Sequence, residues 1–126
     1  MVFNRTTETD LTEDQLPQVD IYKYKQVIFV GDSRTEFMEN VLTGMGESAT
    51  KNVKFVCSAG KGLDWFTTTG WAQLYSIVQH DSNSILSKKT AVIFNFGVND
   101  LSKSADYAEY YNWIAPQLKS KGCELY

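Results

Sequence analysis

Two patterns of hydrophobic and polar positions alternate along this chain. Four short, mostly apolar runs, typical of strands, occupy residues 26–30, 53–57, 91–96 and 123–126. Between them, apolar residues recur three or four positions apart, which predicts helices from residue 33 to about 44, over 70–79 and over 105–119. The first helix carries four apolar side chains on one side: Phe37, Met38, Val41 and Leu42. Strands that alternate with helices predict an α/β domain with a parallel sheet, right-handed crossovers and helices on both faces.

We expect this domain to occupy residues 21–126. Residues 1–20 are polar and acidic, contain Pro17 and show no sustained periodicity, so we expect them to form an arm or loop. Because the runs at 26–30 and 91–96 are the most apolar, we expect these two strands at the centre of the sheet.

Length, composition and charge restrict the class of protein. The chain has 126 residues, of which 43% are hydrophobic and 21% are charged, as expected for one globular domain. With a net charge of −3 and scattered lysines, the sequence lacks the clustered basic surface that nucleic-acid binding requires. No apolar run approaches the roughly 20 residues of a membrane span, and the N-terminus has no apolar signal-peptide core. Nothing therefore predicts a nucleic-acid or membrane partner, and the cellular location stays open.

The chain has two cysteines, too few for a zinc site made of cysteines alone. Cys57 and Cys123 fall in the second and fourth predicted strands, which are not neighbours in the usual doubly wound order. We therefore expect two free thiols that pack as small hydrophobic residues.

The two central strands each end in a glycine followed by small polar residues. These breaks are Gly31-Asp32-Ser33 and Gly97-Val98-Asn99-Asp100, and a third turn, Gly60-Lys61-Gly62, follows the strand at 53–57. In a parallel sheet all three turns lie at the carboxyl edge, where open α/β folds place their ligands. We therefore expect Ser33 and Asn99, far apart in the sequence, to lie close together in the fold.

This arrangement has the parts of an ester-hydrolysing site. A nucleophilic serine needs a sharp turn from strand to helix, and the oxyanion formed by its attack needs hydrogen-bond donors. Ser33 has this position, and its backbone N–H at the helix start is one donor. A glycine N–H of the second turn and the side-chain amide of Asn99 are two further donors.

A purely structural interpretation uses the same residues. Ser33 and Glu36 have the spacing of a capping box, in which a serine N-cap pairs with a glutamate three residues later. Asp32 suits the positive end of a helix dipole, and Asn99 with Asp100 is typical of an Asx turn. The convergence of three turns on one edge favours the catalytic interpretation.

The same turns resemble the first three sequence blocks of the SGNH (GDSL-type) hydrolases. The resemblance is carried by Val30-Gly31-Asp32-Ser33, by the glycine turn at 60–62 and by Gly97-Val98-Asn99-Asp100, and it spans about residues 27–100. Members of this family are serine esterases, lipases and carbohydrate acetylesterases on a flavodoxin-like three-layer α/β/α sandwich with a parallel sheet. The resemblance implies this fold and the hydrolysis of an ester.

The resemblance also implies a role for each residue of the turns. The implied nucleophile is Ser33 Oγ. The implied oxyanion-hole donors are Ser33 N–H, Gly62 N–H and the Asn99 side chain. Gly60 is the alternative to Gly62 as the oxyanion glycine. Asp32 and Asp100 support the turns, Asp100 as a hydrogen-bond acceptor rather than a catalytic acid. Neither a metal nor another cofactor is implied.

The catalytic base of such a site is missing from the sequence. The fourth block of the family is an Asp-x-x-His pair, and this string does not occur. The only histidine, His80, follows the helix predicted at 70–79, so we expect it at the opposite edge of the sheet from Ser33. The chain stops at Tyr126 within a predicted strand. We therefore expect the N-terminal portion of a longer esterase, weak or inactive as given, which self-associates through that strand edge.

The predicted substrate is a small-molecule ester. The absence of a long apolar insertion that would act as a lid favours a small acyl ester such as an O-acetyl group, including one on a carbohydrate. Trp65 and Phe66, which follow the glycine turn, either line a pocket or pack in the core. Arg34 either contacts a polar substrate or lies on the surface without a role.

Two other functions use the same turns. A catalytically silent module would bind a carbohydrate or an anion at the carboxyl edge of the sheet. A flavodoxin-like phosphate or nucleotide binder would place a phosphate over Asp32 and Ser33. This second alternative is disfavoured because neither G-x-G-x-x-G nor G-x-x-x-x-G-K-[ST] occurs.

Overall fold

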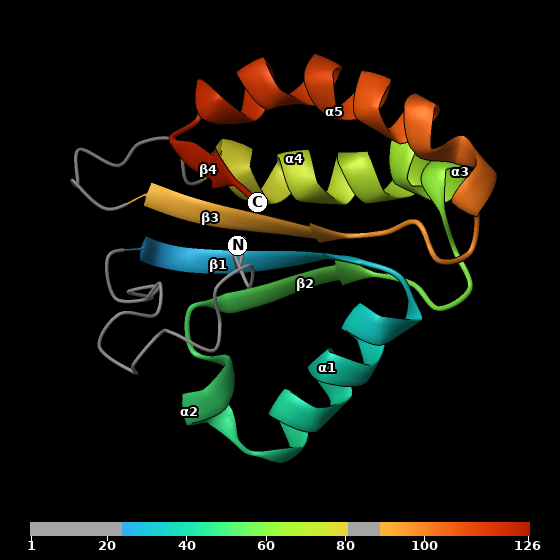
Figure 1. Cartoon of the computed structure of the whole chain (residues 1–126). Coiled ribbons are helices and arrows are strands. Elements are labelled where there is room, and N and C mark those ends of the chain that lie inside the picture. The colour runs from blue at the N-terminus through green and yellow to red at the C-terminus, as the bar shows by residue number, and fades with distance from the viewer. Residues whose placement is uncertain (1–23, 81–88) are drawn as a thin grey trace, which may run out of the picture.

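The computed structural model describes residues 24–80 and 89–126 and shows a parallel sheet with helices on both faces (Figure 1). Its strands are β1 (Tyr24–Gly31), β2 (Val53–Cys57), β3 (Lys89–Asn95) and β4 (Cys123–Leu125), in the spatial order β2-β1-β3-β4. This confirms the α/β class and the central position of the two most apolar strands. The arm predicted at residues 1–20 lies outside the described residues.

Helices and short helical turns connect the strands. They are α1 (Ser33–Gly44), α2 (Glu47–Thr50), α3 (Leu63–Trp65), the π-helical turn η4 (Phe66–Gly70), α4 (Trp71–His80), the 3₁₀ turn η5 (Leu101–Lys103) and α5 (Ser104–Lys119). α1 and α2 lie on one face of the sheet, whereas α4 and α5 cover the other (Figure 1). No helix among the described residues has the length and apolar character needed to cross a membrane.

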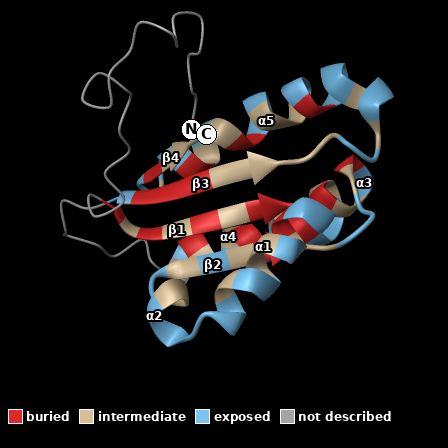
Figure 2. Ribbon diagram, turned by 60° about the horizontal axis from the view of Figure 1, so that its bottom comes forward, coloured by how far each residue is buried: buried red, intermediate tan, exposed pale blue. Residues whose placement is uncertain are grey.

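The hydrophobic core lies between the sheet and the pair α4 and α5. Ile28 and Val30 of β1 and Val92 of β3 are buried there, because successive strand residues point to opposite faces. Figure 2 shows the buried residues concentrated on β1 and β3. Four buried residues of α4 and α5 close the core from above: Leu74, Val78, Ile114 and Leu118.

The helical segment after β2 begins earlier than the periodicity predicts. Helical backbone starts at Leu63 and passes through η4 before α4 begins, whereas the prediction started at residue 70. η4 contains three consecutive threonines, which carry no apolar period, and the hydroxyls of Thr67 and Thr68 donate to the carbonyl of Asp64 at 3.2 and 2.8 Å. Phe66 in this turn is buried in the core, which confirms the core alternative for its side chain.

α1 forms where predicted, but its apolar side is only partly buried, with Met38 and Leu42 half-buried. Phe37 is 70% exposed and Val41 45% exposed. The buried residue of α1 is Thr35, which packs against Gly31 at the end of β1. A Cβ at Gly31 would also lie 2.6 Å from the carbonyl oxygen of Asn95, so this glycine allows α1 and β3 to approach closely.

Cys57 and Cys123 lie in β2 and β4, at opposite edges of the sheet, and both are free thiols, as expected. Burial and the neighbouring Glu39 raise the pKa of Cys57 to about 12. Since the thiolate is the reactive form of cysteine, Cys57 is a poor nucleophile at neutral pH.

Candidate functional site

The candidate site lies at the carboxyl ends of three neighbouring strands. The register pairs Gly31 of β1 with Cys57 of β2 and with Asn95 of β3, so these strands end at the same level. The chain passes from β1 to β2 on one side and returns to β3 on the other side of β1. The ends of β1 and β3 therefore flank a topological switch point, where open α/β folds bind ligands.

Ser33 is the first residue of α1, and the N-cap is Asp32. Asp32 Oδ1 accepts the N–H of Arg34 at 3.1 Å, and its carbonyl accepts the N–H groups of Thr35 and Glu36, each at 3.0 Å. The capping box with Ser33 as N-cap is therefore wrong, because the buried Asp32 carboxylate takes that position. Ser33 is exposed, and within residues 24–80 and 89–126 its N–H has no acceptor.

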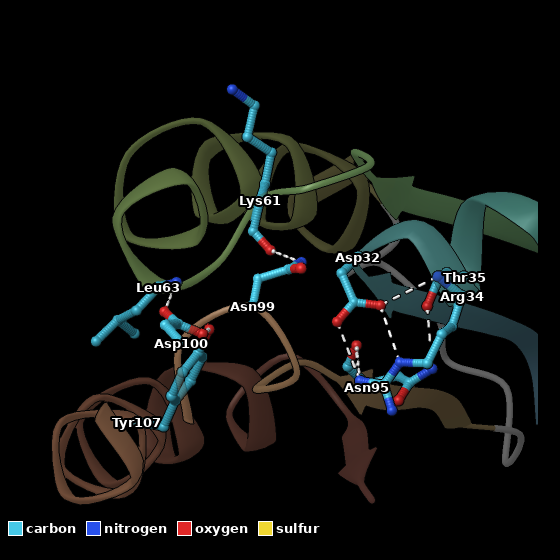
Figure 3. A network of polar contacts seen from close by, with 9 residues as sticks. All are labelled: Asp32, Arg34, Thr35, Lys61, Leu63, Asn95, Asn99, Asp100 and Tyr107. Atoms are coloured by element: carbon cyan, nitrogen blue, oxygen red, sulfur yellow. Dashed lines mark hydrogen bonds and ion pairs between the residues drawn. The ribbon is translucent and has the colours of Figure 1, made fainter. Parts of the chain in front are cut away.

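Arg34 forms a two-pronged ion pair with Asp32 (Figure 3). Nε donates to Asp32 Oδ1 at 3.1 Å and Nη2 donates to Oδ2 at 3.0 Å. The Asp32 side chain is 0% exposed and the Arg34 side chain 48% exposed. The hydrogen bond to Asp32 raises the pKa of Arg34 above its ordinary value. Nη2 also lies 3.5 Å from the carbonyl oxygen of Asn95, so one guanidinium connects the ends of β1 and β3.

Asn99 and Asp100 connect the loop after β3 to the glycine turn. Asn99 Nδ2 donates to the carbonyl of Lys61 at 2.9 Å, which leaves the second hydrogen of this amide for another acceptor. Asp100 Oδ2 accepts the N–H of Leu63 at 2.9 Å, and Oδ1 accepts the hydroxyl of Tyr107 at 2.7 Å (Figure 3). Burial and then the bond to Asp100 raise the pKa of Tyr107 above its ordinary range. Asp100 is thus a hydrogen-bond acceptor that organises two loops and α5.

The two glycines of the turn are required for different reasons. A Cβ at Gly62 would lie 2.7 Å from Asp100 Cγ, so any side chain there would displace the carboxylate. Gly60 instead has φ of +71°, a conformation that side-chain-bearing residues rarely adopt. The N–H of Gly62, like that of Ser33, has no acceptor among the residues that the structure describes.

A cavity of about 310 Å³ opens beside the loop after β3. It is lined by polar groups of Arg34, Asp100 and Tyr107 and by apolar side chains that include Phe96 and Val98. Its volume is at the lower end of the range for ligand pockets. Ser33, Gly62 and Asn99 are not among its lining residues.

Among residues 24–80 and 89–126, no base contacts the side chain of Ser33. Within the described residues Ser33 Oγ makes no hydrogen bond. His80 is the last residue of α4, and α4 runs from the candidate site back toward the amino ends of the strands (Figure 1). In the same described part of the chain, no cluster of three or more His, Cys, Asp or Glu residues could hold a metal ion.

Sequence reasoning missed two residues that shape the site. The apolar periodicity that predicts the helix at 105–119 gives Tyr107 no polar role, yet its hydroxyl donates to Asp100. The sequence leaves open whether Arg34 contacts a substrate or has no role on the surface, whereas in the structure it pairs with Asp32. An aspartate at an N-cap with an arginine two positions later is a usable sequence signal for the second case, whereas the Tyr107 contact depends on how α5 packs.

Comparison with known proteins found no relative: no family model, no curated protein and no solved structure matches the chain.

Proposed function

We propose that this chain carries the nucleophile and the oxyanion hole of an SGNH-type serine ester hydrolase. The observation that carries the proposal is a pair of backbone N–H groups, those of Ser33 and Gly62, that have no acceptor within the described residues at one sheet edge. Their neighbours are already used, since Arg34 N–H binds Asp32 and Leu63 N–H binds Asp100. Unused N–H groups at a helix start are suited to bind developing negative charge.

The strand order supports a flavodoxin-like form of the fold. Sheets of that type begin with the order 2-1-3-4, as this sheet does, and bind their ligand between the first and third strands. Because the same order serves many unrelated activities, the proposal rests on the site residues and not on the fold.

In the proposed reaction, Ser33 Oγ attacks the carbonyl carbon of a small acyl ester such as an O-acetyl group on a carbohydrate. The carbonyl oxygen becomes an oxyanion that accepts hydrogen bonds from Ser33 N–H, Gly62 N–H and Asn99 Nδ2. The bond to the alcohol then breaks, the alcohol leaves with a proton, and water hydrolyses the acyl-serine. Since no base contacts Ser33 Oγ in the described residues, its proton passes to water or hydroxide, and we expect slow turnover.

Labelling with a small fluorophosphonate tests the nucleophile. We expect mass spectrometry to find the label on Ser33 and Ser33→Ala to abolish it, whereas Ser48→Ala, an exposed serine on α2, is the matched control and keeps it. Asn99→Ala should slow labelling roughly 100-fold, the usual effect of removing one oxyanion donor. Equal labelling of the wild type and Ser33→Ala would overturn the assignment.

A binding module without catalysis is the second candidate, because Ser33 Oγ has no hydrogen-bond partner in the described part of the chain. Such a module would bind an acetylated saccharide at the same edge and leave it intact. NMR shifts at Ser33 and Asn99 on titration with an acetylated disaccharide, without acetate release or probe labelling, would favour this function over hydrolysis.

A further inference from the structure

Asp32 presents an electrostatic problem for the proposed oxyanion hole. Its carboxylate is 0% exposed, and its own carbonyl carbon is bonded to the nitrogen of Ser33, whose N–H is a proposed oxyanion donor. An uncompensated negative charge so close to a developing oxyanion would oppose the charge that the site must stabilise, and water does not reach Asp32 to screen it.

Arg34 is positioned to compensate the negative charge of the Asp32 carboxylate. Its guanidinium spans both carboxylate oxygens, with Nε on Oδ1 at 3.1 Å and Nη2 on Oδ2 at 3.0 Å. The planar fork of arginine matches a carboxylate in a way that the point charge of lysine does not. Arg34 also reaches the carbonyl of Asn95 at 3.5 Å, so the same side chain joins the ends of the two central strands.

We propose that Arg34 is a positioning residue of the candidate active site, which neutralises the buried Asp32 carboxylate so that the Ser33 N–H can stabilise an oxyanion. This inference rests on the proposed function. It assigns Arg34 no contact with the reacting atoms, and its effect on the reaction passes through Asp32. The role is therefore one of charge compensation, in addition to fixing the first turn of α1.

The charge role and a purely mechanical role make different predictions for a double substitution. Arg34→Gln leaves the Asp32 charge buried and unpaired, so we expect the second-order rate of Ser33 labelling by a small uncharged fluorophosphonate to fall at least about tenfold. Asp32→Asn combined with Arg34→Gln removes both charges while the asparagine oxygen can still cap the helix. Because the buried charge is gone, we expect this double variant to label at least about threefold faster than Arg34→Gln alone.

Two further variants complete the test. Lys103→Gln removes one positive charge near the same edge. Among the described residues, the ion-pair partner of Lys103 is the 93% exposed side chain of Asp64, at 3.4 Å, so the labelling rate should stay within about twofold. Arg34→Lys keeps the charge without the fork and should label faster than Arg34→Gln, which keeps the comparison usable if the glutamine variant is unstable. Circular dichroism checks that every variant compared is folded.

The outcomes separate this inference from the proposed function. If the wild type labels at Ser33 and Arg34→Gln labels equally fast, the inference is overturned and the nucleophile assignment stands. If the double variant labels as slowly as Arg34→Gln, Arg34 acts only as a mechanical clamp and charge compensation is overturned. If the wild type does not label at Ser33, the proposed function is overturned and this inference with it.

Discussion

At the scale of single residues, the carboxylate of Asp100 connects three parts of the chain. It accepts the N–H of Leu63, accepts the hydroxyl of Tyr107 on α5 and lies against Gly62. A partly buried carboxylate is costly unless donors satisfy it, so these contacts hold the loop after β3 in one arrangement. The position of the preceding residue, Asn99, follows from that arrangement.

Gly62→Ala should displace the Asp100 carboxylate, because the new Cβ would lie 2.7 Å from Asp100 Cγ. We expect the free energy of unfolding, measured by urea denaturation, to fall by about 1–3 kcal/mol. Gly44→Ala is the matched control, since a Cβ there meets nothing within 4 Å and alanine is the better helix former. A Gly62→Ala protein as stable as the wild type would contradict the described packing of the two loops.

At the scale of elements, apolar periodicity does not predict which helical segment buries its phenylalanine, as the segments after β1 and β2 show. The regular apolar side of α1 leaves Phe37 exposed, whereas the turn η4, without an apolar period, buries Phe66 completely. Phe66 contacts four aromatic rings with centroid distances from 5.1 to 6.3 Å: Phe94, Phe96, Tyr110 and Tyr111. Position relative to the sheet, not periodicity, decides which phenylalanine contributes to stability.

This contrast predicts unequal effects for two similar substitutions. Phe66→Ala should lower the free energy of unfolding by about 3–5 kcal/mol, because it leaves a cavity among packed rings. Phe37→Ala, the matched control on an exposed helix surface, should change it by less than about 0.5 kcal/mol. Thermal or urea denaturation of both variants checks the prediction, and equal losses would mean that α1 packs differently from the arrangement described.

At the scale of the whole molecule, β4 lies at one edge of the sheet and pairs with β3 over three registered positions. Among the described residues its outer edge has no strand partner. Tyr126 N–H donates to the carbonyl of Val92 at 2.9 Å, so the N–H of Leu125, one residue earlier, points away from β3. The outward N–H of Leu125 is therefore a donor with which a strand of a second copy can pair.

We expect the chain to form dimers through this edge as its concentration rises, measured by light scattering. Leu125→Pro removes the outward N–H while the Tyr126 bond to β3 remains, so this variant should stay monomeric. Circular dichroism controls for its folding. A wild type that stays monomeric at millimolar concentration would show that the edge does not self-associate.

Alkaline pH should destabilise the whole molecule through tyrosine side chains that are buried or half-buried. Burial is the largest cause that raises the pKa of Tyr24, Tyr107 and Tyr111, and Glu124 or Asp100 adds to it. The unfolded chain, with tyrosines near the ordinary pKa of 10.0, therefore loses these protons first. The stability that the protonated phenols contribute is present below that pH and is lost as the pH rises above it.

Urea denaturation between pH 8 and pH 11 checks this prediction. The free energy of unfolding should fall above about pH 10, and Tyr107→Phe, which cannot ionise, should make the fall less steep. A slope that Tyr107→Phe leaves unchanged would show that Tyr107 does not contribute to it.

Much of the architecture is predictable from local patterns. The four strands occur where the apolar runs predict them, with boundaries shifted by at most two residues. Apolar β1 and β3 lie at the centre because residues buried on both faces must be apolar. The turns with Ser33, Gly62 and Asn99 share one sheet edge because parallel strands align their carboxyl ends.

The partners of individual side chains depended on the packing of elements that are distant in the sequence. The spacing of Ser33 and Glu36 fits a capping box, but Asp32 caps α1 because Arg34 and the buried end of β1 hold its carboxylate. The bonds of Asp100 to Leu63 and Tyr107 form only when the crossovers place α3 and α5 beside the loop after β3. Periodicity indicates which residues share one face of a single helix or strand. Side-chain contacts between elements form only when the sheet and its helices are assembled.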